Sequence, residues 1–259
     1  MRARLISALA RAAAAVPSHR FRFWFVEQTL ERDPHAVLQP VGAAQNRGRR
    51  LAEAPLDLEP SSELGFEDLA GLFASSILNH GVIGMTIRQA AYIFGLTRRT
   101  GATKAIEIGR WRGGSTLILA AAMGREGKLW SIDIGEKAER VLGEHGQTLD
   151  DETRSFCERF GLDVELVVGD SHTLELETGE VDVVLVDGDH TYEGTRADVE
   201  RWGRRLRIGG ALFVDDAFDD YFVPSHPESA GRVVRELQAA GDFRLVKAAD
   251  RLAHLERIR

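Results

Sequence analysis

Short apolar segments alternate with amphipathic segments from about residue 104 to the end of the chain, and this alternation restricts the possible folds more than any other feature. The segment VDVVLVDGD (181–189) is almost continuously apolar before its acidic end, as expected for a strand buried on both faces of a sheet. Six more strands are predicted at 104–109, 128–133, 164–170, 210–216, 243–250 and 251–258. Strands that alternate with helices predict an α/β fold with a doubly wound, mostly parallel, seven-stranded sheet of the Rossmann-like kind, closed by a C-terminal antiparallel hairpin.

The chain is expected to divide into an N-terminal extension, residues 1–62, and one Rossmann-like domain, residues 63–259. The extension begins with an alanine-rich segment that Arg11 interrupts, which favours an amphipathic helix over a signal peptide. Residues 21–30 mix aromatic residues with arginine, and this segment either packs on the domain or docks on a partner, a membrane surface or a second copy of the chain. The domain is expected to open with helices at 65–81 and 86–101, the second beginning with a capping box of Thr86 and Gln89.

Composition excludes several classes of protein. The formal net charge of −7 leaves no basic excess to neutralise phosphates, so nucleic acid is not expected as the main partner. Cys157 is the single cysteine, which excludes an internal disulfide, and we expect it simply to be packed in a helix. No apolar segment approaches the roughly 18 residues that span a bilayer, so we expect no transmembrane segment and a cytoplasmic protein.

The segment EIGRWRGGST (107–116) links the first strand to its helix and predicts a cofactor loop. Gly109 and Gly113 allow a tight turn and a close approach of the backbone to a ligand, and Ser115 lies at the start of the helix. A dehydrogenase fingerprint requires glycine where this chain has Trp111. Glu107 would repel a pyrophosphate but suits the ammonium and sulfonium charges of S-adenosylmethionine. The alternative is a glycine turn used only for packing.

Polar residues follow the next two strands as well. Asp133 ends the second strand, where a carboxylate can accept hydrogen bonds from both ribose hydroxyls. Asp170 and Ser171 end the third strand, at the height expected for an adenine edge. Aspartate often caps turns after strands, so each position alone is a weak signal. Their order along three successive strands favours a cofactor site at the carboxyl end of the sheet.

A second group of acids follows the fourth and fifth strands. Asp187, Asp215 and Asp216 should converge, because these two strands are neighbours in the predicted topology. Three nearby carboxylates repel one another unless a cation neutralises them, and an all-oxygen site suits Mg²⁺, Mn²⁺ or Ca²⁺. We therefore predict a divalent-metal site, with Mg²⁺ as the expected ion. The alternatives are that Asp215 or Asp216 caps the following segment and that Asp189 faces solvent.

His190 lies three residues beyond Asp187 and is the predicted catalytic base. A histidine near neutrality can remove the proton from an acceptor hydroxyl, so activity should rise between about pH 6 and 8. His226 could touch the substrate, and the other histidines have no comparable acidic setting in the sequence.

The segments EIGRWRGGST and VDGDHTYEGTRADVERWGRRLRIGGALFVDD together resemble the class I methyltransferases related to catechol and caffeoyl-CoA O-methyltransferases. They are more similar still to the branch that methylates sugar hydroxyls of macrolide antibiotics and other natural products. The resemblance covers roughly residues 80–259. It implies that Asp187, Asp215 and Asp216 hold Mg²⁺ and that His190 stands where the macrolide-sugar enzymes carry a histidine. The catechol enzymes have lysine there and Asp-Asn after the fifth strand, which argues against a catechol acceptor.

These features predict a methyltransferase that uses S-adenosylmethionine and a divalent cation to methylate a hydroxyl of a small molecule or sugar. A metal-independent methyltransferase would share the fold and the cofactor but would not need the acids. Trp111 argues against an NAD-dependent oxidoreductase. The acids and His190 together argue against a non-catalytic scaffold, which has no need for them.

Overall fold

The computed structural model describes residues 63–73, 82–135, 148–218 and 230–259. The predicted extension at 1–62 and His226 therefore lie outside the described residues. Within the described ranges, no helix is long and apolar enough to cross a membrane.

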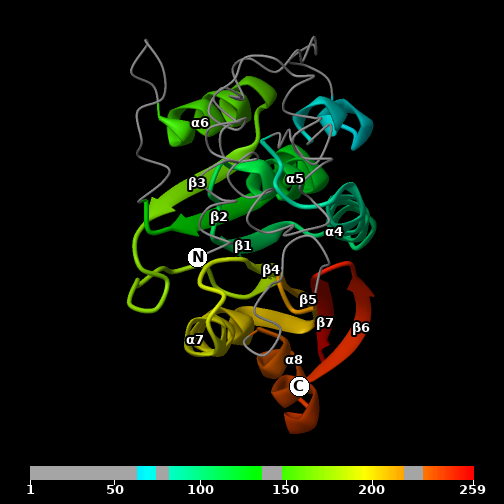
Figure 1. Cartoon of the computed structure of the whole chain (residues 1–259). Coiled ribbons are helices and arrows are strands. Elements are labelled where there is room, and N and C mark those ends of the chain that lie inside the picture. Colours follow the sequence, from blue (N-terminus) through cyan, green and yellow to red (C-terminus); the bar gives the residue numbers. More distant parts are fainter. Residues whose placement is uncertain (1–62, 74–81, 136–147, 219–229) are drawn as a thin grey trace, which may run out of the picture.

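One seven-stranded sheet forms the centre of the domain, in the order β3-β2-β1-β4-β5-β7-β6 (Figure 1). Its strands are β1 (Lys104–Ile108), β2 (Lys128–Asp133), β3 (Asp163–Val168), β4 (Val181–Val186), β5 (Leu206–Val214), β6 (Phe243–Ala249) and β7 (Leu252–Arg257). The first five strands pair in parallel, while β7 pairs antiparallel with both β5 and β6. The predicted Rossmann-like fold and its closing hairpin are confirmed.

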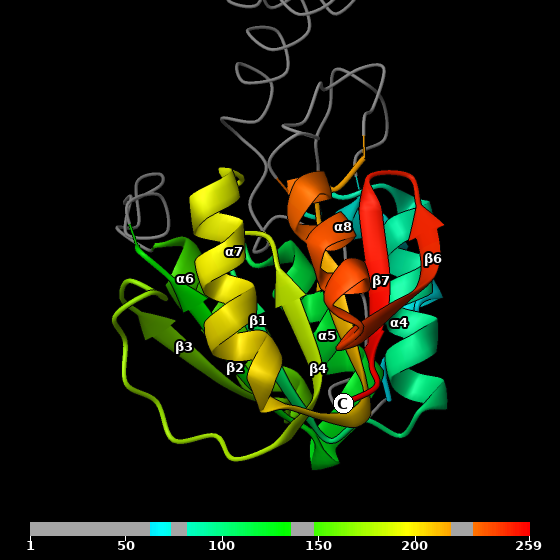
Figure 2. The same ribbon diagram turned by 90° about the horizontal axis from the view of Figure 1, so that it is seen from below.

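Helices cover both faces of this sheet (Figure 2). One face carries α4 (Ile87–Arg99), α5 (Gly114–Met123) and α6 (Leu149–Phe160), and the other carries α7 (Tyr192–Trp202) and α8 (Ala230–Ala240). Short 3₁₀ turns occur at η3 (Glu67–Leu72), η4 (Gly124–Glu126) and η5 (Gly203–Arg205). Sequential β-α-β units with helices on both faces leave the carboxyl ends of the parallel strands free for a ligand site.

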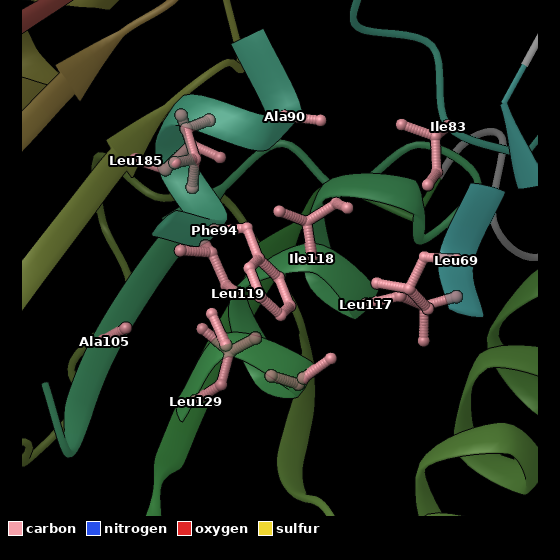
Figure 3. Close-up of a cluster of buried hydrophobic side chains, with 14 of the residues drawn as sticks. Leu69, Ile83, Ala90, Phe94, Ala105, Leu117, Ile118, Leu119, Leu129 and Leu185 are labelled. Carbon is pink, nitrogen blue, oxygen red and sulfur yellow. The ribbon is translucent and has the colours of Figure 1, made fainter. Parts of the chain in front are cut away.

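Two apolar cores, one on each face, explain the near-continuous apolar character of the central strands. In β4, Val183 and Leu185 pack in the core beneath α4 and α5, while Val184 and Val186 pack in the core beneath α7 and α8. Figure 3 shows the first core, where side chains from α4 and α5 meet those of β1, β2 and β4. Helix α5 is buried over residues 114–122, which accounts for its lack of a polar face.

Helix α4 begins where it was predicted to begin, but the segment before it is not the predicted helix. Thr86 Oγ1 accepts a hydrogen bond from the Gln89 amide at 3.1 Å, and Gln89 Oε1 accepts one from the Thr86 amide at 2.8 Å, so the capping box is confirmed. The helix predicted over 65–81 is a 3₁₀ turn over Glu67–Leu72 in its described part. Phe73 leaves the turn to form a parallel bridge with Ile83, which is incompatible with a continuing helix.

Cys157 is buried in α6, and burial raises the pKa of its thiol to about 12. A thiol with so high a pKa is a poor nucleophile, which agrees with the predicted packing role.

His254, on the antiparallel strand β7, should make the free energy of unfolding depend on pH. Its Nδ1 lies 2.7 Å from the Tyr92 hydroxyl, and burial lowers the pKa of His254 to about 4. The unfolded chain binds more protons between pH 4 and the ordinary histidine value near 6.5, so stability should fall by about 1–3 kcal/mol as pH drops through this window. His254→Gln should remove most of that loss. Urea unfolding at pH 7 and 4.5 measures it, and an equal loss in the variant would contradict the assignment.

Candidate functional site

A cavity of about 630 Å³ opens at the carboxyl ends of β1, β2, β3, β4 and β5. This is a typical size for a small-molecule site, and the position is the one where open α/β sheets bind ligands. The loops that follow these five strands line it, together with Val82, Gly84, Met85 and Arg251. The structure places most of the predicted site residues in its wall: Gly109, Ser115, Asp133, Asp170, Ser171, Asp187, His190, Asp215 and Asp216.

Two glycines shape the cofactor loop because no side chain would fit at either position. Gly109 has a φ of 84°, and a Cβ there would lie 2.1 Å from the Asp187 carbonyl oxygen. Gly113 has a φ of 81°, and a Cβ there would lie 2.3 Å from Thr153 Oγ1 on α6. Gly109 lines the cavity, whereas Gly113 is placed against α6 and starts α5.

Glu107 is fully buried, and it is absent from the cavity wall. Its Oε2 accepts hydrogen bonds from the Thr116 and Ser131 hydroxyls, each at 2.5 Å. Its Oε1 accepts no hydrogen bond from the described residues. Burial raises the pKa of Glu107, against the neighbouring hydroxyls, which lower it. A buried carboxyl oxygen of this kind retains the capacity to accept a donor.

Asp133 fastens the cofactor loop to the end of β2. Its Oδ2 accepts hydrogen bonds from the backbone amides of Arg110 at 3.0 Å and Trp111 at 3.1 Å. Its Oδ1 accepts one from the Gly135 amide at 2.8 Å. The carboxylate therefore already fixes the loop, and carboxylate oxygens have further acceptor capacity for a ligand hydroxyl.

Arg110 provides a second support that the sequence did not reveal. Its guanidinium is buried, donates to Asp150 at the start of α6, and also donates to the carbonyl oxygens of Ser131 and Val167, both at 2.9 Å. An arginine inside a glycine-rich loop looks like a solvent-exposed residue in sequence. The three partners come from β2, β3 and α6, so only the folded chain identifies this role.

The residues after β3 form a small polar network at one end of the cavity. Asp170 Oδ1 accepts a hydrogen bond from the His172 amide at 2.9 Å, and the Ser171 hydroxyl donates to Asp198 Oδ1 at 2.6 Å. His172 Nε2 lies 3.5 Å from the same Asp198 oxygen. His172 lines the cavity beside two acids. The expectation that no histidine other than His190 has an acidic setting is therefore wrong, because the partner Asp198 comes from α7.

The three predicted metal-binding acids follow β4 and β5 and line another part of the cavity, its acidic end. Asp187 is partly exposed to the cavity, and the surrounding protein raises the pKa of its carboxyl well above the ordinary value, with added repulsion from Asp215 and Asp216. Burial also raises the pKa of Asp215, while the nearby Arg251 lowers it. Asp216 has a φ of 53°, a left-handed conformation that is uncommon outside glycine, asparagine and aspartate.

Two partners of these acids come from distant parts of the chain. The Arg251 guanidinium, from the turn between β6 and β7, donates to Asp216 Oδ1 and lies 3.9 Å from Asp215 Oδ2. Gln89 Nε2, from α4, donates to Asp215 Oδ1 at 2.8 Å. Sequence reasoning found neither residue, because arginine in a hairpin turn and glutamine in a first helical turn are both ordinary surface features.

The chemistry of the three carboxylates fits a hard divalent cation, which prefers oxygen ligands. The guanidinium of Arg251 already occupies the place of a cation beside two of them. Across the part of the chain that the structure describes, no three His, Cys, Asp or Glu side chains are grouped so that they could hold a metal ion as they stand. The donor set therefore suits a metal, and the present side-chain positions do not yet form its coordination sphere.

His190 stands on the loop between β4 and α7. Its Nδ1 lies 3.5 Å from Asp216 Oδ2, and its side chain is 36% exposed. Asp189 is exposed, and its carboxylate accepts hydrogen bonds from the Thr191 amide and hydroxyl, both at 2.9 Å. Thr191 in turn caps α7. The loop is thus held on one side while His190 remains accessible to the cavity.

Solved structures of the same fold include three that can be compared with this chain. The cofactor-bound protein Rv0187 from MTB is 20% identical over 93% of this chain and 98% of its own, with a TM-score of 0.52. The O-methyltransferase from Bacillus cereus in complex with SAH is 19% identical over 67% and 82%, with a TM-score of 0.52. The O-methyltransferase NovP is 18% identical over 70% and 86%, also with a TM-score of 0.52. At these identities the likeness shows the shared fold.

A family model described as a methyltransferase domain matches residues 106–217. This range begins in β1 and ends after β5, so it includes the cofactor loop, the acids after β4 and β5, and His190. Residues 106–217 of this chain therefore match a methyltransferase domain, and the solved structures share its Rossmann-like fold.

Proposed function

We propose that the protein transfers the methyl group of S-adenosylmethionine to a hydroxyl of a small molecule or sugar, with a divalent cation, expected to be Mg²⁺, at Asp187, Asp215 and Asp216. One observation carries the proposal. A single cavity joins the glycine loop after β1 to the acids after β4 and β5. A methyl donor at one end and an acceptor hydroxyl at the other would share this space, as in-line transfer requires.

The cofactor end of the cavity offers groups that match S-adenosylmethionine. Gly109 lets the backbone approach the ligand, Gly113 allows the loop to pack against α6, and Ser115 lies in the first turn of α5. Glu107, with its unused buried oxygen, suits the positive charge of the methionine part. This carboxyl lies behind the cavity wall, so we propose that it acts on the ligand through the neighbouring Ser115 hydroxyl or through water.

The nucleoside part of the cofactor is assigned to the ends of β2 and β3. Asp133 lines the cavity and retains acceptor capacity for the ribose hydroxyls. Asp170 and Ser171 also line the cavity, and we expect the adenine ring beside them; the Ser171 hydroxyl donates a hydrogen bond to Asp198. The O-methyltransferase from Bacillus cereus was solved in complex with SAH, which supports the same ligand here.

The acceptor end supplies acid–base chemistry. A neutral alcohol is a poor nucleophile, so a base must take its proton as the methyl group is transferred. His190 lies beside Asp216 and is open to the cavity, where it can accept that proton. Asp216 can stabilise the imidazolium that results.

A divalent cation bound to Asp187, Asp215 and Asp216 would lower the pKa of an acceptor hydroxyl. These residues supply oxygen ligands only, which favours Mg²⁺ over zinc. Their mutual repulsion also favours a bound cation. The Bacillus cereus protein and NovP, which share this fold, are both O-methyltransferases, and this supports a hydroxyl acceptor here. A methyl transfer that needs no metal ion is the alternative.

The cofactor assignment predicts that Asp133→Ala weakens binding of S-adenosylhomocysteine by about 1.5–3 kcal/mol for each charge-assisted hydrogen bond lost. Release of the cofactor loop from Asp133 should add to the loss. Isothermal titration calorimetry measures the affinity. Asp163→Ala is the matched control, because Asp163 begins β3 at the other end of the strands from the cavity, where it pairs with Lys128 at 2.9 Å. Unchanged affinity in Asp133→Ala would contradict the assignment.

The same samples test the reaction class. Titration with NAD should give no binding, and methyl transfer from radiolabelled S-adenosylmethionine should be detected on a panel of sugars and phenols. Transfer only to amines or carboxylates would overturn the O-methyltransferase proposal. Full turnover in excess EDTA would overturn the metal part alone.

A further inference from the structure

Arg251 brings a positive charge into the acidic end of the cavity from outside the methyltransferase core. It stands in the turn between β6 and β7, beyond the matched range 106–217. Its side chain is only 14% exposed. Its guanidinium hydrogen-bonds Asp216 Oδ1 and lies 3.9 Å from Asp215 Oδ2. A surface turn has thus placed an arginine on two of the three proposed metal ligands.

The backbone of this turn is fixed from two sides. Asp250 has a φ of 53° and accepts hydrogen bonds from the Thr86 hydroxyl at 2.6 Å and from Arg88 at 3.3 Å, which ties the turn to the start of α4. The Arg251 carbonyl oxygen accepts a hydrogen bond from the Ala217 amide at 2.9 Å. Helix α4 and the β6–β7 hairpin lie side by side in both views (Figure 1 and Figure 2). Hydrogen bonds to the start of α4 and to Ala217 therefore fix the position of the turn that carries the Arg251 guanidinium.

The surrounding negative charges explain why the Arg251 guanidinium lies at the acidic end of the cavity. Asp187, Asp215 and Asp216 all line this end of the cavity. Neighbouring carboxylates repel one another when ionised. The Arg251 guanidinium stays protonated at every pH of interest, so it is a permanent counter-ion for them. Gln89 satisfies a further oxygen of Asp215 at 2.8 Å without adding charge. Among the described residues, Arg251 thus places a permanent positive charge beside Asp215 and Asp216.

We propose that Arg251 is a tethered counter-ion that a divalent cation must displace from Asp215 and Asp216, so that Arg251 sets the metal affinity of the site. A metal ion bound to Asp216 would compete with Arg251 for the oxygens of this carboxylate. It also brings a second positive charge, which the guanidinium repels. The inference rests on the proposed function only in taking these acids as the metal site.

The test is Mn²⁺ binding to the full chain, measured by electron paramagnetic resonance of the free ion. Arg251→Gln should bind Mn²⁺ about tenfold or more tightly than the wild type, the ratio that 1.4 kcal/mol gives. Arg207→Gln is the matched control. Arg207 Nε also pairs with an aspartate, Asp182, at 2.6 Å, but near the start of β5, at the other end of the sheet. It should leave Mn²⁺ affinity unchanged.

Each outcome decides the proposal. Equal or weaker Mn²⁺ binding by Arg251→Gln overturns it, as does the absence of binding in both proteins. Binding by the variant alone supports it and shows that the wild-type site is closed to metal, which would overturn the metal part of the proposed function. Calorimetry with S-adenosylhomocysteine on the same samples reads the methyltransferase assignment independently. Should Arg251→Gln not fold, Arg251→Lys gives the answer, because lysine lacks the planar fork and should raise Mn²⁺ affinity by a smaller factor.

Discussion

Gly109→Ala should destabilise the protein by about 3–5 kcal/mol and abolish cofactor binding. Two separate effects add at this position. The residue has a φ of 84°, where an alanine is strained, and the new Cβ would lie 2.1 Å from the carbonyl oxygen of Asp187 and 2.8 Å from the Cα of Gly188. These are backbone atoms, so no side chain can rotate away. The loops after β1 and β4, which form both ends of the cavity, would have to separate.

Gly101→Ala separates the two effects. Gly101 has a similar φ of 62°, but a Cβ there would have nothing within 4 Å. Only the strain of the left-handed conformation remains, so we expect a loss of about 1–2 kcal/mol and unchanged cofactor affinity. Urea unfolding curves and calorimetry with S-adenosylhomocysteine measure both quantities. Equal unfolding midpoints for the two variants would show that the close approach at Gly109 is not rigid.

The fold could be predicted because its signals are local. Successive side chains of β4 point to opposite faces of the sheet, and each face packs against its own apolar core. Both sets of side chains from 183 to 186 are therefore apolar, which gives the near-continuous apolar segment. The ends of strands were less predictable. The strands predicted at 164–170 and 181–189 end at Val168 and Val186, because the residues that follow turn into the cavity instead of pairing.

The positions of the cavity-lining acids could be predicted because these residues lie at or close after the ends of strands. Asp133 ends β2, Asp170 comes two residues after β3 and Asp187 directly follows β4, and the strand order brings them to one end of the sheet. Arg251 and Gln89 reach Asp216 and Asp215 from the hairpin turn and α4, and no periodicity in the sequence indicates such a contact. Glu107 shows the opposite case. Its position before the loop was recognised, but its burial behind the cavity wall depends on the hydroxyls of Thr116 and Ser131.

The charge of the acidic end also depends on residues that lie far apart in sequence. Sequence reasoning counted three carboxylates and inferred a metal ion as the missing cation. The structure adds Arg251, which neutralises part of the same charge. Arg251 thus supplies a positive charge that the sequence did not indicate, and the metal ion stays a prediction.

His190→Ala should lower kcat by about 10²–10⁴, the usual contribution of a positioned base. The variant should keep its affinity for S-adenosylhomocysteine, because His190 lies at the acidic end beside Asp216, away from the residues after β1 to β3 that are assigned to the cofactor. Its pH–rate profile should lack the ascending limb that a histidine base is expected to give the wild type. Steady-state assays of methyl transfer across pH, with calorimetry on the same variant, test all three expectations.

His172→Ala is the matched control, because this histidine lines the same cavity but lies 3.5 Å from Asp198 instead of beside Asp216. It should raise KM for S-adenosylmethionine and leave kcat within a few-fold of the wild type. Near wild-type turnover in His190→Ala would make His190 structural. Asp189 would be a poor substitute as the base, since hydrogen bonds from the backbone and hydroxyl of Thr191 lower the pKa of its carboxyl and occupy both oxygens. A large loss of kcat confined to His190→Ala would therefore place proton removal on this one imidazole.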